Sequence, residues 1–285
     1  MDKTLTNKEL KEVAADIRKL ILKTTHNAGV GHTGGSLSET DILTALFFRV
    51  MNVDPKNPRM ENRDRFILSK GHATPGYYST LARRGFFPLE ALDTFDQLGT
   101  KLQGHPDMNK TPGVDMSSGS LGQGLSCGIG MAMASEDLGL GYTSFVLMGD
   151  GESTEGQIWE AAMYAAANKV DNVISTIDYN GRQIDGDVED VLSLGDLEGK
   201  WKAFGWEVLV EDNGNDMKSV IEVLNKAKSL TGNGKPVMIL LKTEMGQGVD
   251  YMMGTHKWHG SAPNDEQLEN ALGQLEETLG EYQMA

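Results

Sequence analysis

An aspartate and an asparagine stand 30 positions apart, each directly after an apolar stretch: Asp150 in the run VLMGDGE and Asn180 in the run TIDYNGR. One carboxylate oxygen and one amide oxygen are hard ligands, but they are too few to enclose a metal ion alone. Mg²⁺ prefers six oxygen ligands and usually takes the remainder from phosphate and water. The pair therefore predicts a magnesium diphosphate site.

The elements around this pair support the prediction. Residues 143–148 and 172–177 are apolar and partly β-branched, and the Ala-rich run QIWEAAMYAAANK between them is typical of a helix, which together make a βαβ unit. Ligands of such units lie beyond the carboxyl ends of the strands. Gly149 and Gly151 flank the acid, and we expect their N–H groups to be free to face an anion. The alternative is that GDG and DYNG are only tight turns.

Four of the six histidines stand beside glycine in loops: His32, His72, His105 and His259. A lone histidine is more often structural than catalytic, but four in this setting favour a function. Histidine can donate to phosphate, hold a sugar hydroxyl or carry a proton near neutral pH. His26, at the end of the first predicted helix, is expected to be structural.

Two motifs suggest other sites but fail on context. Gly29, Gly31 and Gly34 form a literal G-x-G-x-x-G, but it follows a helix, whereas the dinucleotide fingerprint follows a strand. His256 and His259 lack acidic or cysteine companions, which argues against a zinc site.

Strands and helices alternate along the rest of the chain, which predicts an α/β fold with a doubly wound, mostly parallel sheet and helices on both faces. The absence of a linker or repeat favours a single domain over residues 1–285. NAGVGHTGGSLS is expected to be a glycine-rich break after the first helix. Further strands are predicted in FILSKGHA, GWEVLVEDNG and PVMILLK, and further helices in ILTALFFRVM, YYSTLARR, LSCGIGMAMASED and DMKSVIEVLNKAKSL.

Composition argues against several classes of function. The formal charge is 26 − 41 = −15 without a basic cluster, which disfavours nucleic acid as a partner. No stretch approaches the roughly 18 apolar residues of a membrane helix, and the start lacks a signal region, so we expect a cytoplasmic protein without membrane contact. Cys127 is the only cysteine, which excludes an intrachain disulfide, and is expected to be buried on a helix.

Taken in order, the motifs resemble the amino-terminal, diphosphate-binding half of transketolase, a thiamine diphosphate enzyme. They are GHTGGSLS, DRFILSKGHA, LQGHPD, SSGSLGQGLSCGIGMAMA, GDGESTEGQIWEAA, DYNGRQIDG and GTHKWHG. The resemblance implies the thiamine diphosphate-binding fold. It also implies transfer of a two-carbon ketol unit from a ketose to an aldose.

The resemblance further implies a set of metal and diphosphate contacts. Asp150, Asn180 and the main-chain carbonyl of Arg182 would hold Mg²⁺, with Ca²⁺ or Mn²⁺ as substitutes. The family often has an apolar residue at the position of Arg182, but only the backbone oxygen is used. His72 and His259 would donate to the diphosphate.

His32 and His105 would face the reacting carbon, and Glu155 would link two active sites across a subunit interface. Ser38 replaces a common glycine and has no functional interpretation. The cofactor-binding set implied by the resemblance is His72, Gly119, Ser120, Leu121, Gly149, Asp150, Gly151, Glu152, Asn180 and His259. The catalytic set is His32, His72, His105, Glu155 and His259.

The glutamate that activates thiamine lies in the family's pyrimidine-binding domain, which this chain lacks. The resemblance therefore implies an N-terminal subunit that works with a second chain carrying the pyrimidine-binding and carboxy-terminal domains, as an α₂β₂ assembly. The alternatives are a component of a 2-oxo acid dehydrogenase E1 or of a 1-deoxyxylulose-5-phosphate synthase-like enzyme, or a non-catalytic scaffold. The substrate stays open among sugar phosphates, sulfonated sugars and other ketoses.

Overall fold

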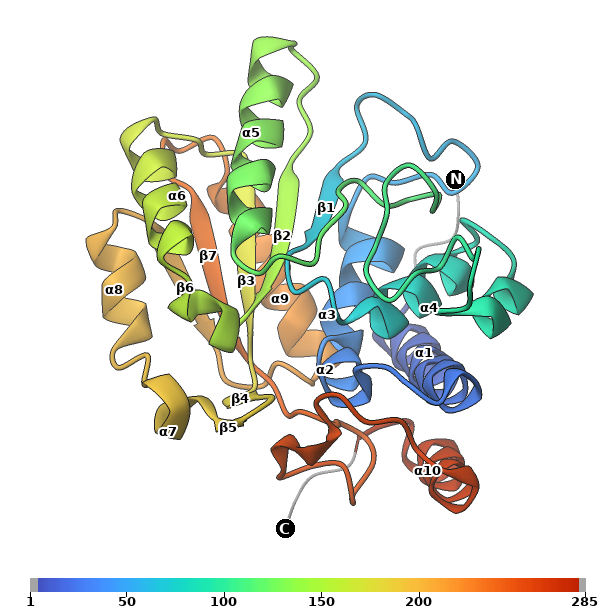
Figure 1. The fold of residues 1–285 in the computed structure, drawn as a ribbon. Helices are drawn as coiled ribbons and strands as arrows, with labels where there is room; N and C mark the ends of the chain where they lie inside the picture. Colours follow the sequence, from blue (N-terminus) through green and yellow to red (C-terminus); the bar gives the residue numbers. More distant parts are fainter. Residues whose placement is uncertain (1–4, 282–285) are drawn as a thin grey trace.

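The computed structural model describes residues 5–281 and is built on a five-stranded sheet in which every neighbouring pair is parallel (Figure 1). In spatial order the strands are β1 (Arg65–Leu68), β2 (Ser144–Gly149), β3 (Val173–Tyr179), β7 (Val237–Lys242) and β6 (Glu207–Glu211). A short antiparallel hairpin of β4 (Arg182–Gln183) and β5 (Gly186–Asp187) follows β3. The predicted doubly wound α/β fold with a mostly parallel sheet is confirmed.

The helices surround this sheet. They are α1 (Asn7–Ala28), α2 (Thr33–Ser38), α3 (Thr40–Ala45), the π-helical turn η1 (Leu46–Val50), α4 (Thr74–Arg84), η2 (Leu89–Thr94), α5 (Gln123–Asp137), η3 (Gly151–Thr154), α6 (Gly156–Ala167), α7 (Val188–Leu192), α8 (Leu197–Ala203), α9 (Met217–Leu230), η4 (His256–Trp258) and α10 (Asp265–Thr278).

Alternating side chains of the strands build one core on each face of the sheet. Phe66 and Leu68 of β1 and Phe145 of β2 pack in the core that includes α3, α4 and α9. Ile67 and Val146, one position along, pack with α5, α6 and α8. Because both faces are covered, the strands are mainly apolar, which is why they could be recognised in the sequence.

Small residues let α5 lie close against the sheet. A Cβ atom at Gly128 would collide with Val146 of β2, and one at Gly124 would collide with Ser69 at the end of β1. The opposite side of α5 faces outward. Cys127 lies on that side and is exposed, so the prediction that it is buried was wrong. The predicted helix is present, but its glycines, and not Cys127, face the sheet.

Two sequence predictions for the first 50 residues need correction. The expected glycine-rich break contains helix α2, whose six residues are all buried. The expected buried helix at residues 42–51 is α3 continued by the π-helical turn η1. The first helix is confirmed, and Thr6 and Glu9 form a capping box at its start.

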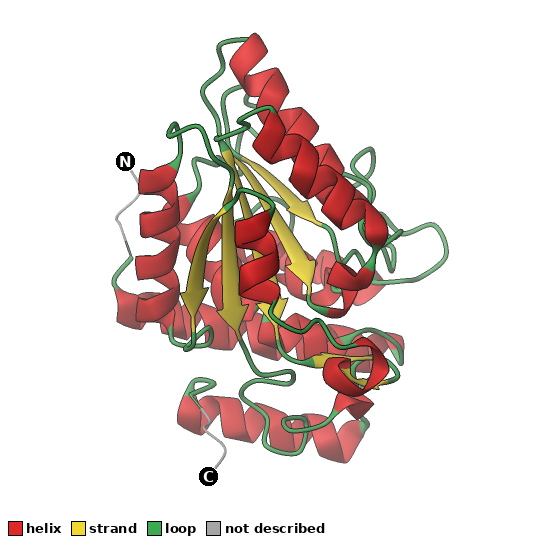
Figure 2. Ribbon diagram, turned by 90° about the vertical axis from the view of Figure 1, so that its left-hand side faces the viewer, coloured by secondary structure: helices red, strands yellow, loops and turns green. Residues whose placement is uncertain are grey.

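The carboxyl ends of the strands point toward the C-terminal segment that carries η4 and α10 (Figure 2). Helix α10, which the sequence analysis did not predict, packs through Ala271 and Leu275 against Ile17 and Ile21 of α1. The segment that carries η4 thereby lies beside α2, near the carboxyl ends of the strands. No helix within residues 5–281 is long and apolar enough to cross a membrane.

Candidate active site

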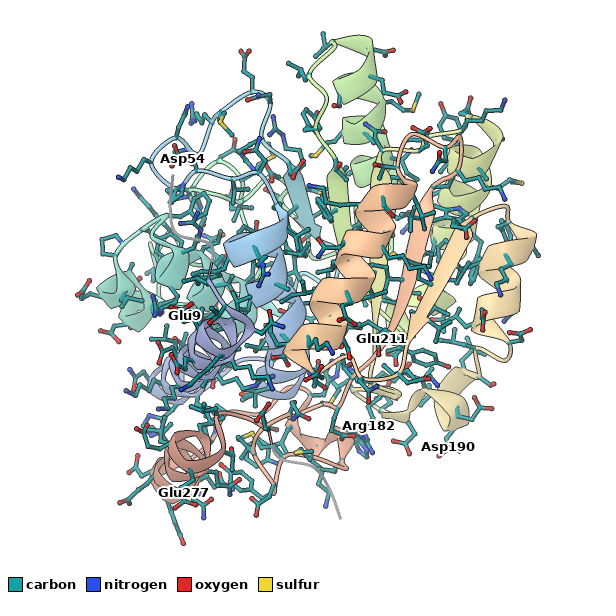
Figure 3. The ribbon with its side chains drawn as sticks, turned by 180° about the vertical axis from the view of Figure 1, so that it is seen from behind. Glu9, Asp54, Arg182, Asp190, Glu211 and Glu277 are labelled. Carbon is teal, nitrogen blue, oxygen red and sulfur yellow. The ribbon has the colours of Figure 1, made fainter. Side chains whose placement is uncertain are left out.

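A cavity of about 240 Å³ opens at the carboxyl ends of the strands. It is lined by Gly35, Lys70, His72, Leu121, Gly149, Asp150, Gly151, Glu152, Thr154, Glu155, Asn180, Arg182, Gln183, Ile184, Met245 and His259. Ten residues of the predicted site are in that set. Arg182, at the start of the β4–β5 hairpin, lies beyond the carboxyl ends of the strands (Figure 3). The four predicted site residues that are not in the set are His32, His105, Gly119 and Ser120.

Asp150 is buried, with 2% of its surface exposed. Its Oδ1 accepts a hydrogen bond from Gly151 N at 2.7 Å, and its Oδ2 accepts one from Gly181 N at 2.5 Å. Burial, followed by the neighbouring carboxylate of Asp178, raises the pKa of Asp150 to about 7. A buried carboxylate of this kind is stabilised in its charged form by a bound cation.

Asn180 presents the two ends of its amide to different partners. Its Nδ2 donates to Asp178 Oδ2 at 3.2 Å, and its Oδ1 accepts from Arg182 N at 3.0 Å. The guanidinium of Arg182 is held by Glu244 at 2.8 Å, which leaves the backbone of Arg182 as the part relevant to a metal. Within residues 5–281, no group of three or more His, Cys, Asp or Glu side chains is placed to hold a metal ion. A metal here would need amide, backbone and ligand oxygens in addition to Asp150.

Two histidines, His72 and His259, line the cavity, and His32 packs against both of them. The ring centroids of His32 and His72 lie 4.7 Å apart, those of His72 and His259 5.3 Å apart, and those of His32 and His259 5.5 Å apart. Burial is the main cause that lowers the pKa of His72 to about 2 and that of His259 to about 4. Burial also lowers the pKa of His32. Near neutral pH these rings are uncharged, so each can donate one N–H and accept at the other nitrogen.

His259 carries an unsatisfied group. Its Nδ1 is buried and has no hydrogen-bond partner among the described residues. Buried polar atoms normally have a partner, so this nitrogen is left able to bond to a further polar group.

His105, Gly119 and Ser120 are exposed and lie together beside the cavity. A Cβ atom at Gly119 would lie 3.1 Å from Cδ2 of His105, so the two loops touch. Leu121 reaches the cavity, while Gly119 and Ser120 are exposed. Glu155, also exposed, lines the cavity where helix α6 begins.

The carboxylate of Glu152 is occupied by hydrogen bonds from other residues of this chain. It accepts hydrogen bonds from Ser69 Oγ at 2.5 Å, Gly122 N at 2.8 Å and Gly149 N at 3.0 Å. It thus ties together the loops after β1 and β2 and the start of α5. The N–H groups of Gly149 and Gly151 both donate to carboxylates of this chain, so the expectation that they are free for an anion does not hold in this structure.

A buried charged cluster that the sequence did not predict lies beside the cavity, which its Lys70 lines. Lys70 Nζ lies 2.5 Å from Asp178 Oδ2 and 3.0 Å from Glu39 Oε2. Burial raises the pKa of Glu39 to about 8. The pKa of Lys70 is raised because the two carboxylates outweigh its burial. The available signal was three charged residues in otherwise apolar or small-residue stretches.

Comparison with known proteins agrees with this geometry. The family model "Transketolase, thiamine diphosphate binding domain" matches residues 9–280. The chain is 46% identical to the 6-deoxy-6-sulfo-D-fructose transketolase subunit SqwG of Clostridium sp. (strain MSTE9), over 94% of this chain and 96% of that protein. It is 43% identical to an apulose-4-phosphate transketolase subunit of Phocaeicola vulgatus, over 92% of each chain.

Longer relatives match over part of their length. The chain is 34% identical to transketolase 1 of Escherichia coli and spans 41% of it. The crystal structure of transketolase from Campylobacter jejuni superimposes with a TM-score of 0.88 at 34% identity, over 95% of this chain and 43% of that one. On these matches the chain belongs to the transketolase family, of which it carries the thiamine diphosphate-binding domain.

Proposed function

We propose that this chain is the N-terminal subunit of a heteromeric transketolase that moves a two-carbon ketol unit from a ketose to an aldose. The observation that carries the proposal is one cavity lined by Asp150, Asn180 and two uncharged histidines, His72 and His259, with His32 packed against both rings. A metal diphosphate needs oxygen ligands on one side and hydrogen-bond donors on the other, and the cavity offers both.

The residues present fit a Mg²⁺-bound diphosphate. Asp150 supplies a buried carboxylate that gains from a cation, and Asn180 Oδ1 and the carbonyl oxygen of Arg182 would supply further hard ligands. The orphaned Nδ1 of His259 supports a polar ligand in the cavity. Bound thiamine diphosphate would supply the carbanion chemistry.

The chain's own residues would bind the cofactor, orient the substrate and move protons. His72 and His259 would donate to the diphosphate, and His32 beside them would hold a substrate hydroxyl or carry a proton. His105, exposed beside the cavity, would act on the same reacting end of the substrate. A ring that is neutral at pH 7 can accept a proton without first losing one.

A second chain would complete the enzyme. Because this chain corresponds to about 40% of full-length transketolases, the pyrimidine-binding and carboxy-terminal parts would belong to a partner subunit, in an α₂β₂ assembly. The relatives of matching length are named as subunits for a sulfonated and a phosphorylated sugar. We propose a ketose with a terminal anionic group as donor.

The test is a donor and acceptor screen with the co-purified complex, Mg²⁺ and thiamine diphosphate. Fructose 6-phosphate and 6-deoxy-6-sulfofructose serve as donors, with glyceraldehyde 3-phosphate as acceptor. Transfer from either donor supports the proposal. Release of CO₂ from pyruvate without ketol transfer would instead assign the protein to the oxo-acid-decarboxylating enzymes.

A further inference from the structure

We propose that Asp178 is a positioning residue that turns the amide of Asn180 so that its oxygen, and not its nitrogen, faces the metal. The inference rests on the proposed function, because it concerns the same metal diphosphate site. It assigns a role to Asp178 and to Ser38, whose position in the cluster the sequence left unexplained.

Asp178 is the common acceptor of four donors. Its Oδ2 accepts from Lys70 Nζ at 2.5 Å, from Ser38 Oγ at 2.6 Å and from Asn180 Nδ2 at 3.2 Å. Its Oδ1 accepts from Thr243 Oγ1. Asp178 is 0% exposed, so water does not compete for these positions. The donors come from α2, the loop after β1, the end of β3 and the loop after β7, so the carboxylate is fixed from four directions.

An asparagine side chain has two ends of nearly equal shape, of which only the oxygen can bind a metal. A carboxylate accepts hydrogen bonds and cannot donate when ionised. Asp178 therefore selects the orientation in which the NH₂ group of Asn180 points into the protein. Ser38 Oγ, 3.5 Å from Asn180 Nδ2, lies on the same inner side. The oxygen is left for the other side, where it accepts from Arg182 N at 3.0 Å, and both residues line the cavity.

Lys70 stabilises the ionised carboxylate of Asp178 in its buried position. A buried ionised group without a partner is costly, and Lys70 Nζ supplies the compensating charge at 2.5 Å. The ammonium also donates to Gly35 O at 3.2 Å, which anchors it to α2. An Asn in place of Asp178 would keep the shape and remove the fixed polarity, since its own amide could turn its NH₂ toward Asn180.

The test measures metal binding, independently of turnover. Mn²⁺ is titrated into the chain co-purified with its partner subunit, at saturating thiamine diphosphate, and free Mn²⁺ is followed by electron paramagnetic resonance. The set is the parent, Asp178→Asn, Asn180→Ala and the double variant. We expect Asp178→Asn to weaken Mn²⁺ binding by about 10- to 100-fold, the range typical of groups that orient a metal ligand.

The double variant distinguishes a loss of binding that acts through Asn180 from a general disturbance of the site. If Asp178 acts through Asn180, Asp178→Asn should cost less than about twofold once Asn180 is alanine, because contacting residues are not additive. An equal loss in both backgrounds, or no loss in the parent background, would overturn the inference.

Ser175→Ala is the matched control. Ser175 lies on the same strand, is buried and has no hydrogen-bond partner for its hydroxyl among residues 5–281, so Mn²⁺ affinity should not change. If Asp178→Asn does not fold by circular dichroism, Ser38→Ala replaces it in the same cycle. Its expected loss is about threefold, the low end for one hydrogen bond, because Lys70 and Thr243 still hold the Asp178 carboxylate. No loss, or an equal loss in the Asn180→Ala background, would overturn the inference.

The parent protein distinguishes the two proposals. If the parent does not bind Mn²⁺ in the presence of thiamine diphosphate, the proposed function fails at its metal site. If the parent binds Mn²⁺ and the losses caused by Asp178→Asn and Asn180→Ala are additive, only the orienting role of Asp178 is contradicted.

Discussion

At the scale of single residues, the site combines groups that are costly to bury with the partners that make the burial tolerable. Asp150 accepts two backbone N–H groups, and Asp178 is paired with Lys70. Glu39, buried beside Lys70, is the acid whose pKa is raised to about 8. A cluster of one cation and two carboxylates is neutral when one acid keeps its proton, and Glu39 has fewer donors than Asp178.

Asp150→Ala should remove metal-dependent cofactor binding. The carboxylate is the one charged ligand proposed for the metal, so thiamine diphosphate affinity in Mg²⁺ should fall by more than about 100-fold, beyond the loss typical of supporting residues. Isothermal titration calorimetry on the reconstituted complex measures this. Asp190→Ala, on exposed α7 (Figure 3), is the control and should bind normally. Unchanged affinity in Asp150→Ala would contradict the site assignment.

Glu39→Gln should flatten the dependence of stability on pH. With a pKa near 4.5 when unfolded and about 8 when folded, Glu39 holds a proton in the native state that the unfolded chain has released. Its contribution to stability is therefore present below pH 4.5 and is lost as the pH rises to 8.

Urea unfolding from pH 5 to 9 checks this prediction. The parent should lose stability relative to Glu39→Gln as the pH rises, by an amount on the order of a few kcal/mol. Exposed Glu160→Gln is the control and should follow the parent. Parallel curves for the parent and Glu39→Gln would show that Glu39 is ionised in the native protein.

At the scale of elements, close packing of α5 on the sheet is what brings the 118–122 loop to the cavity. Gly124 and Gly128 allow this approach, and Glu152 fixes the start of α5 through Gly122 N. Gly71 is similar, because a Cβ atom there would lie 2.6 Å from Ser118 Oγ. Small residues thus position the site without touching it.

Gly128→Ala and Gly130→Ala should have opposite effects on stability. The added methyl at 128 collides with Val146, so the free energy of unfolding should fall by about 1–3 kcal/mol. At 130 an added Cβ has no described atom within 4 Å, so helix propensity should raise it by about 0.5–1 kcal/mol. Urea titration of the purified variants gives both values. Equal effects would show that α5 can shift on the sheet.

At the scale of the whole molecule, the C-terminal segment folds back beneath the strands and supplies His259. Buried Arg18 of α1 connects the parts: it pairs with Asp41 at 2.5 Å and donates to Gln247 O at 3.2 Å. Helix α10 packs on the same helix. The first and last thirds of the chain thereby contribute to one site, where His259 lies against His32 and His72.

Transketolase activity should require both subunits. We expect no measurable ketol transfer by this chain alone, because the proposed activating glutamate belongs to the partner. Adding the partner at fixed chain concentration should raise the rate until the two are equimolar. Sedimentation velocity at that ratio should give a species of α₂β₂ mass. Activity of the isolated chain would contradict the split assembly.

The sequence by itself determined the α/β class, the strands and the placement of Asp150 and Asn180 at neighbouring strand ends. This was possible because doubly covered strands are mainly apolar, and because parallel strands bring their carboxyl ends to one edge. The four loop histidines were also found, because glycine neighbours marked them.

Only the tertiary structure decided which side chains meet at the carboxyl ends of the strands. Lys70, Glu39 and Asp178 come from separate segments, and no local spacing relates them. The same holds for the three ring contacts of His32, His72 and His259, and for the use of the Gly149 and Gly151 N–H groups. Local patterns report burial and periodicity, whereas pairing of buried charges depends on the order of strands in the sheet and on the path of the loops between them.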